Sequence, residues 1–202
     1  MEHWMHPYEK LSLFSTGLVL AVWLIGLHSL MLVKSEPMKR FLVAFPRNQV
    51  LGQVLLGLGF AWFWLLVAPS GLGILSSLSM NLGDFPGAKP ILRMLVPVAL
   101  VMVVVSVKDF LAVRALGVLG LLVASPLLEA AFLKDPMSRL LVPIYAYALL
   151  TASLFWVGMP YLFRDAVTWV TTGTLRWKVA ALAGLGYGVA TFACALLYWR
   201  GS

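Results

Sequence analysis

The stretch Val-Lys-Asp-Phe-Leu at residues 107–111 is a short charged break between two long apolar runs. Similar breaks occur at residues 38–42, Met-Lys-Arg-Phe-Leu, and at residues 163–167, Phe-Arg-Asp-Ala-Val. Each break follows one apolar run, continues into a mixed stretch with further basic residues, and leads into a second apolar run. We name each charged break, together with the mixed stretch around it, a tip (residues 34–47, 107–114 and 163–178), and we interpret the chain as one two-helix unit that is repeated three times.

The composition is typical of an integral membrane protein. Apolar residues make up 61% of the chain and charged residues 11%, whereas a soluble domain has about 25% charged residues. A soluble chain of 202 residues could not bury six separate apolar runs of nearly spanning length. The sequence therefore predicts an all-α, polytopic membrane protein with six transmembrane helices, arranged as three antiparallel hairpins with short interfacial helices at the tips.

All 202 residues, 1–202, are predicted to form a single transmembrane domain. Its hairpin units cover about residues 9–68, 91–133 and 139–199, and residues 69–90, rich in Gly, Ser and Pro, form an outer connecting loop. The loop is interpreted as a plain linker, with a lid over one face as the alternative. The first apolar run is not preceded by a basic segment, which favours a retained span over a signal peptide.

Basic residues predict the orientation of these spans. Nine of the 15 Lys and Arg residues lie at the tips, and the positive-inside rule then places the tips in the cytoplasm and both termini outside. The predicted location is the bacterial inner membrane, and the expected partners are the bilayer and its anionic headgroups rather than nucleic acid. The tip residues expected to contact these headgroups are Lys39, Arg40, Arg47, Lys108, Arg114, Arg164, Arg176 and Lys178.

The third apolar run carries a charge unusually deep in the membrane. Only residues 94–107, 14 in number, separate Arg93 from Lys108, which is about 21 Å of helix against a hydrocarbon layer of about 30 Å. Glu129 lies 15 residues after Arg114, just as Arg93 lies 15 residues before Lys108. We therefore predict an intramembrane ion pair between Arg93 and Glu129, which either gates a cavity or stabilises a thin hairpin.

Motifs for catalysis, cofactor binding and metal binding are missing from the sequence. We find no Ser-His-acid set, glycine-rich phosphate loop or zinc-protease motif, so no catalytic residue and no cofactor are predicted. The single Cys194 excludes a disulfide within the chain. His3 and His6 could reach one metal ion but lack a third ligand, so we interpret them as solvated and leave metal binding as the minor alternative. His28 is expected to hydrogen-bond to a neighbouring helix.

The function predicted from these features is that of a non-enzymatic inner-membrane protein, a scaffold or an accessory subunit that packs against other membrane subunits. The alternative is a small transporter or channel for an ion, a lipid or an apolar solute. Few polar side chains interrupt the spans, which favours the scaffold. A cavity that reaches the middle of the membrane, with Gln53, Arg93 or Glu129 facing it, would favour the transporter. Ala180, Gly184 and Gly188 form a small-residue face on which another helix can approach closely.

Overall fold

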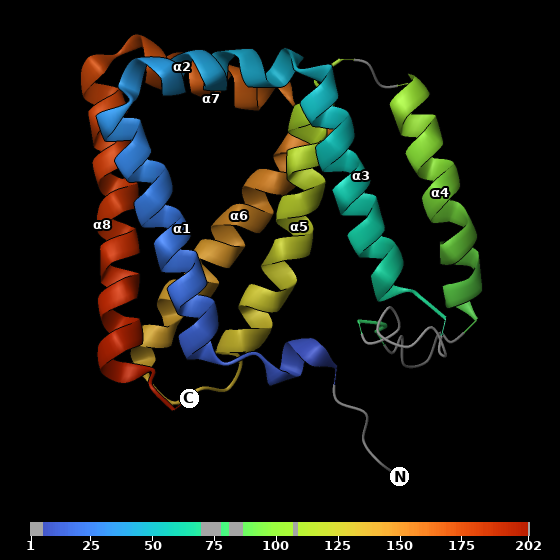
Figure 1. Cartoon of the computed structure of the whole chain (residues 1–202), viewed down its shortest axis with the longest axis horizontal. Helices are drawn as coiled ribbons and strands as arrows, with labels where there is room; N and C mark the ends of the chain where they lie inside the picture. The colour runs from blue at the N-terminus through green and yellow to red at the C-terminus, as the bar shows by residue number, and fades with distance from the viewer. Residues whose placement is uncertain (1–5, 70–77, 81–86, 107–108, 202) are drawn as a thin grey trace.

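The computed structural model describes residues 6–69, 78–80, 87–106 and 109–201, and all regular structure in these residues is helical (Figure 1). The long helices are α1 (Leu13–Val33), α3 (Gln49–Leu66), α4 (Ala88–Ser106), α5 (Leu111–Ala131), α6 (Leu141–Gly158) and α8 (Thr174–Tyr198). The shorter helices are α2 (Ser35–Ala44) and α7 (Tyr161–Thr172), and the single 3₁₀ turns are η1 (Pro7–Lys10), η2 (Phe45–Arg47) and η4 (Met137–Leu140).

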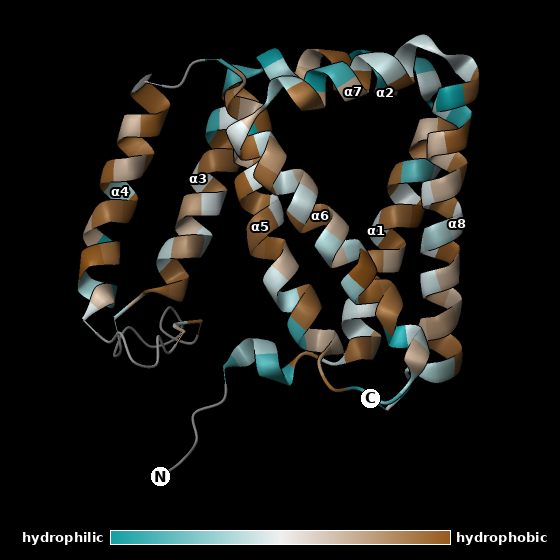
Figure 2. Ribbon diagram, turned by 180° about the vertical axis from the view of Figure 1, so that it is seen from behind, coloured by the Kyte–Doolittle hydropathy of each residue, from teal (hydrophilic) through white to brown (hydrophobic). Residues whose placement is uncertain are grey.

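Six of these helices, α1, α3, α4, α5, α6 and α8, are long and apolar enough to cross a membrane. They run back and forth between two ends of the molecule, and their surfaces are largely hydrophobic (Figure 2). The predicted class, an all-helical protein with six candidate membrane spans, is confirmed. The third span is longer than expected, because α4 starts at Ala88 and its 19 residues give about 28 Å of helix.

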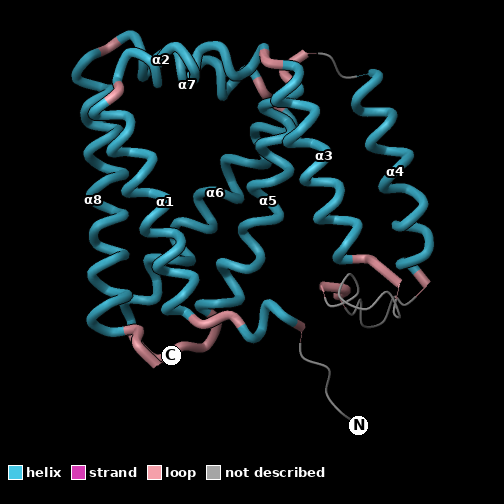
Figure 3. Tube along the Cα trace, viewed as in Figure 1, coloured by secondary structure: helices cyan, strands magenta, loops and turns pink. Residues whose placement is uncertain are grey.

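The two short helices lie across one end of the bundle. Figure 3 shows α2 and α7 at the end where α1, α6 and α8 meet the first and third tips, and the two helices contact each other. Asp109 and Phe110 at the second tip form only a turn, with Phe110 in the left-handed region at φ 57°, and α5 follows directly. The predicted short tip helix is therefore present at two tips and is missing from the described part of the second. Residues 107 and 108, including Lys108, lie outside the described residues.

The long helices do not pack as the three predicted hairpins. Helix α1 packs along α8, α5 packs against both α6 and α3, and α4 packs mainly on α3 (Figure 1). Helix α2 explains why α1 does not pack against α3. Its 10 residues span about 15 Å and separate the two helices by more than the 8–10 Å of packed helices. Helix α7 separates the tip-side ends of α6 and α8 in the same way.

The small-residue face of α8 receives α1. A Cβ atom added at Gly188 would come within 3.0 Å of the Leu24 Cβ atom, and one added at Gly184 would collide with the His28 ring. The predicted close helix approach on this face is therefore confirmed. The imidazole of His28 bonds within its own helix, since its Nδ1 atom lies 2.7 Å from the Leu24 carbonyl oxygen, and not to a neighbouring helix as predicted.

Helix α5 is the centre of the fold. Of the residues in its candidate membrane span 44% are buried, compared with 6% for α4. Glycines let α6 approach α5 closely, because a Cβ atom at Gly117 would lie 2.8 Å from the Ser153 carbonyl oxygen. Leu56 of α3 packs on the other side of α5 beside Ala115. Helices α3, α5 and α6 therefore form one packed layer, while α1 and α8 form a second pair.

Candidate functional site

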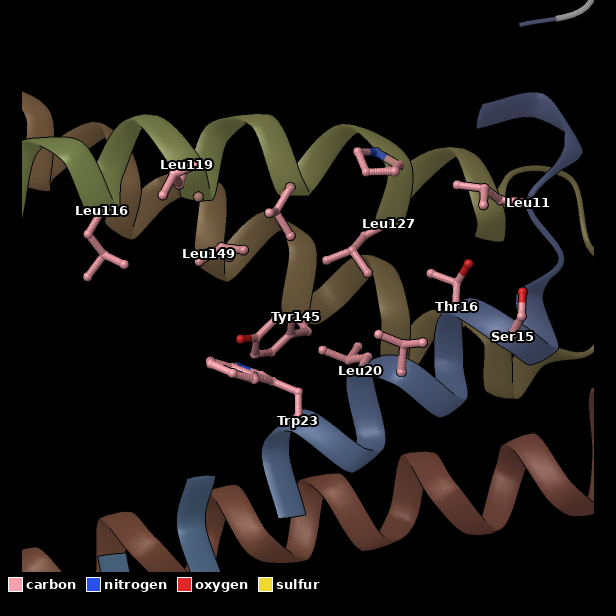
Figure 4. A pocket seen from close by; sticks show the side chains of 14 residues that line it. Leu11, Ser15, Thr16, Leu20, Trp23, Leu116, Leu119, Leu127, Tyr145 and Leu149 are labelled. Carbon is pink, nitrogen blue, oxygen red and sulfur yellow. The ribbon is translucent and has the colours of Figure 1, made fainter. Parts of the chain in front are cut away.

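An apolar groove lies between the α1–α8 pair and the layer that contains α5 and α6 (Figure 4). Its volume is about 520 Å³, which is within the 300–1,000 Å³ usual for small-molecule sites. One wall comes from α1 and the preceding Leu11, and the other comes from α5 and α6. The 14 lining residues are Leu11, Ser15, Thr16, Val19, Leu20, Trp23, Leu116, Leu119, Gly120, Val123, Pro126, Leu127, Tyr145 and Leu149.

The groove forms because α1 follows α8 and makes few contacts with α5. Gly120 of α5 lines the floor of the groove. It has no side chain to fill the groove, and α6 packs closely against it. Val19 and Trp23 lie on the rim and remain 71% and 62% exposed. The groove is therefore open at the surface of the bundle, where the acyl chains of a bilayer would meet it.

Four polar side chains line the groove: Ser15, Thr16 and Trp23 on the α1 wall and Tyr145 on the α6 wall. Ser15 is hydrogen-bonded to Ser12. Figure 4 shows the Tyr145 ring of α6 and the Trp23 ring of α1 in the same part of the groove. The Tyr145 hydroxyl and the Trp23 indole N–H make no hydrogen bond within the described residues. The part of the groove beside Trp23 and Tyr145 thus combines apolar walls with two donors that the described chain leaves without an acceptor.

A second pocket, which we name the basic pocket, lies at the tip end between α2 and α7. Lys39, Arg40 and Arg47 line it, together with Val43, Ala44, Asn48 and Thr171, and its volume is about 710 Å³. The structure therefore brings together three of the tip cations predicted to contact anionic headgroups.

Only one of the three cations in the basic pocket is neutralised within the described residues. Lys39 Nζ lies 2.9 Å from Glu36 Oε1, and this hydrogen bond and the charge of Lys39 lower the pKa of Glu36. Arg40 and Arg47 take part in neither ion pair of the described residues, although the charge of Arg40 also contributes to the lowered pKa of Glu36. The basic pocket consequently keeps an excess of positive charge.

The other tip cations are dispersed around the same end. Arg114 donates from Nη1 to the Val157 carbonyl at 2.9 Å, and its Nε atom is buried without a partner among the described residues. Arg164 pairs with Asp165 at 2.8 Å. Arg176 lies 4.6 Å from the centre of the Trp169 ring. Lys178 is exposed in the first turns of α8.

The predicted ion pair between Arg93 and Glu129 is not formed. Arg93 Nε donates to the Val67 carbonyl at 2.7 Å, and Glu129 takes part in neither ion pair of the described residues. The prediction was wrong because α4 packs on α3 rather than forming a hairpin with α5. Arg93 instead satisfies a carbonyl at the C-terminal end of α3, where a positive charge is favourable.

Arg93 belongs to a polar network at the end of the bundle opposite the tips. The Ala68 carbonyl accepts a hydrogen bond from Ser79 Oγ at 2.8 Å, and Lys89 Nζ donates to the same Ser79 oxygen at 3.0 Å. His6 Nε2 lies 2.9 Å from the Leu78 carbonyl oxygen, and His6 Nδ1 accepts a hydrogen bond from the Tyr8 amide.

The described part of the chain contains no group of three metal-ligating side chains. Both ring nitrogens of His6 take part in hydrogen bonds, so they are not free for a metal ion. His3, the other candidate ligand, lies outside the described residues.

Comparison of the chain with models of known protein families, with curated proteins and with solved structures gave no match. The chemistry of the groove and of the basic pocket therefore carries the functional argument.

Proposed function

We propose that this chain is a non-enzymatic, multi-pass protein of the bacterial inner membrane that holds the apolar part of a lipid or another apolar solute in the groove between α1, α5 and α6. The groove itself carries the proposal. It lies within the spanning parts of three helices, has the volume of a ligand site and is open at the rim beside Val19 and Trp23. The acyl chain of a lipid that diffuses in the bilayer could enter the groove without crossing a polar barrier.

The lining favours an apolar ligand over an ion. None of the 14 lining residues is charged, whereas ion pathways in membrane proteins are lined by charged side chains or by carbonyl groups. Gln53, Arg93 and Glu129, the polar residues expected to mark a transport path, are not among these lining residues. This argues against an ion path and leaves the lipid or apolar-solute branch of the transporter hypothesis.

The proposed orientation places the end with α2 and α7 in the cytoplasm. Both short helices would then lie in the interface, where Trp169 of α7 is a suitable anchor. The basic pocket would contact anionic headgroups of the inner leaflet, each basic residue near the surface contributing about 1 kcal/mol. The start of α1 and the end of α8 lie at the opposite end of the molecule (Figure 1), and the two termini would face the outside.

A substitution on the rim of the groove tests this proposal. Val19→Trp adds a large ring beside the opening, and we expect it to reduce the amount of lipid that stays bound to the purified protein in mild detergent. Native mass spectrometry measures this as the number of lipid molecules retained per chain. The matched control is Val22→Trp, because Val22 is on the same helix, is 60% exposed and does not line the groove. Equal lipid retention by both variants would refute the proposal.

The scaffold hypothesis remains the second candidate, and α4 is the observation that favours it. Only 6% of the membrane-spanning residues of α4 are buried, and this helix packs mainly on α3. A photo-crosslinking residue at Val98, which is 54% exposed, would distinguish the candidates. A discrete membrane protein captured at this site supports a subunit interface, and crosslinks to lipid alone argue against it.

A further inference from the structure

The polar atoms of the groove suggest which chemical class of ligand it takes. An indole N–H is only a donor, and a phenol is a strong donor that can also accept. Neither the Trp23 N–H nor the Tyr145 hydroxyl has an acceptor in the described residues, although both side chains line the same groove. This part of the groove therefore offers two hydrogen-bond donors to a ligand.

The depth of Trp23 argues against water as the acceptor. Trp23 is ten residues from either end of α1, which places it about 15 Å from both ends of a spanning helix. Tryptophan normally lies at the membrane interface, where water and headgroups satisfy its N–H. In the hydrocarbon layer neither is available, and an unpaired polar group there is unfavourable.

We infer that the groove takes an uncharged, long-chain lipid that bears a carbonyl oxygen, and that this oxygen accepts a hydrogen bond from the Tyr145 hydroxyl, with the Trp23 N–H as the second donor. The inference rests on the proposed function and specifies its ligand. The ligand is uncharged because no charged residue lines the groove to neutralise it. Its polar group is an acceptor because a pure hydrocarbon would leave both donors unpaired, and a carbonyl oxygen accepts without adding a donor of its own.

The prenyl quinones carry this chemistry and are the ligand that we infer, and the diacylglycerols, which also bear carbonyl groups, serve as the comparison. A quinone ring places its carbonyl groups within the hydrocarbon layer, whereas the ester carbonyls of a diacylglycerol lie close to the headgroups. The depth of Trp23 favours the quinone. A hydrocarbon of matched length offers the same apolar surface and no acceptor, so it serves as the reference ligand.

The test is a binding titration of the purified, delipidated full-length chain with a prenyl quinone, a diacylglycerol and the matched hydrocarbon. Tyr145→Phe removes only the hydroxyl, and we expect it to weaken binding of the carbonyl ligand about two- to tenfold, the effect of one net hydrogen bond. Binding of the hydrocarbon should not change. Tyr147→Phe is the control, since Tyr147 is on the same helix, is 60% exposed and does not line the groove.

The outcomes separate this inference from the proposed function. If the wild-type protein binds all three ligands, and Val19→Trp abolishes binding while Tyr145→Phe changes nothing, the groove holds apolar chains but the carbonyl inference is wrong. If none of the ligands binds, or if Val19→Trp has no effect on binding, the proposed function fails as well. A loss with Tyr145→Phe for the quinone alone assigns the quinone class, and a loss for the diacylglycerol alone assigns the ester lipid.

Discussion

A single arginine side chain holds the end of α3 against α4. Arg93 donates to the Val67 carbonyl, and hydrogen bonds of charged groups contribute about 1.5–3 kcal/mol. We expect Arg93→Met, which keeps much of the apolar stem, to lower the free energy of unfolding by this amount. Thermal unfolding in detergent measures the change.

Glu129→Gln is the control for the role of Arg93, because the structure pairs Glu129 with no basic residue among those described. We expect this substitution to change stability little. If it destabilised the protein as much as Arg93→Met does, and the two effects were not additive, the ion pair would exist after all.

Glu36 modulates the charge of the basic pocket through Lys39. Lys39 lowers the pKa of Glu36 below its ordinary value of 4.5, so the carboxylate stays ionised at every pH above that value and offsets one positive charge. Glu36→Gln should therefore strengthen binding to anionic vesicles between pH 5 and 8. The difference from the wild-type protein should vanish only as the pH falls through the lowered pKa and protonates Glu36. Vesicle co-sedimentation at several pH values checks this, and a difference that disappeared near pH 6 would contradict it.

Part of the candidate site could be predicted from single residues. The tip cations were identified by their position between apolar runs, and three of them meet at the basic pocket. Trp23 offered a signal that was missed, since a tryptophan in the middle of an apolar run is displaced from the interface it prefers. Tyr145 offered none, because its meeting with Trp23 depends on how α6 crosses the bundle.

The seam between α1 and α8 depends on small residues. Gly188→Val would push against Leu24 and Ile25, and overpacking of this kind costs about 1–3 kcal/mol. Gly186→Val is the matched control, because a Cβ atom at Gly186 meets nothing within 4 Å. We expect a lower unfolding temperature only for Gly188→Val. Equal shifts in both variants would mean that helix propensity, and not the seam, determines the effect.

The existence of the long helices could be predicted from the sequence, but their partners could not. Apolar length is a local property, so all six spans were found, and the small-residue face of α8 marked a packing surface. The pairing of α1 with α8 joins the two ends of the chain, and no local pattern encodes it. The lengths of α2 and α7 are the sequence signal that was missed. A helix that lies across the end of the bundle separates the two spans that it connects.

The orientation of the whole molecule can be tested with cysteine labelling. In a Cys194→Ala background, we expect Leu133→Cys to react with a membrane-impermeant maleimide from outside the cell, and Thr168→Cys to react only after the membrane is opened. Both positions are exposed and lie at opposite ends of the bundle. The reverse labelling pattern would place the basic end outside and would contradict the proposed topology.

The most direct measurement is an experimental structure of the chain in a lipid nanodisc, formed without added ligand. We expect elongated density in the groove between α1, α5 and α6, with a polar end within hydrogen-bonding distance of the Tyr145 hydroxyl. A groove closed by direct packing of α1 on α5, with no space beside Trp23, would contradict the central claim that this bundle holds an apolar ligand.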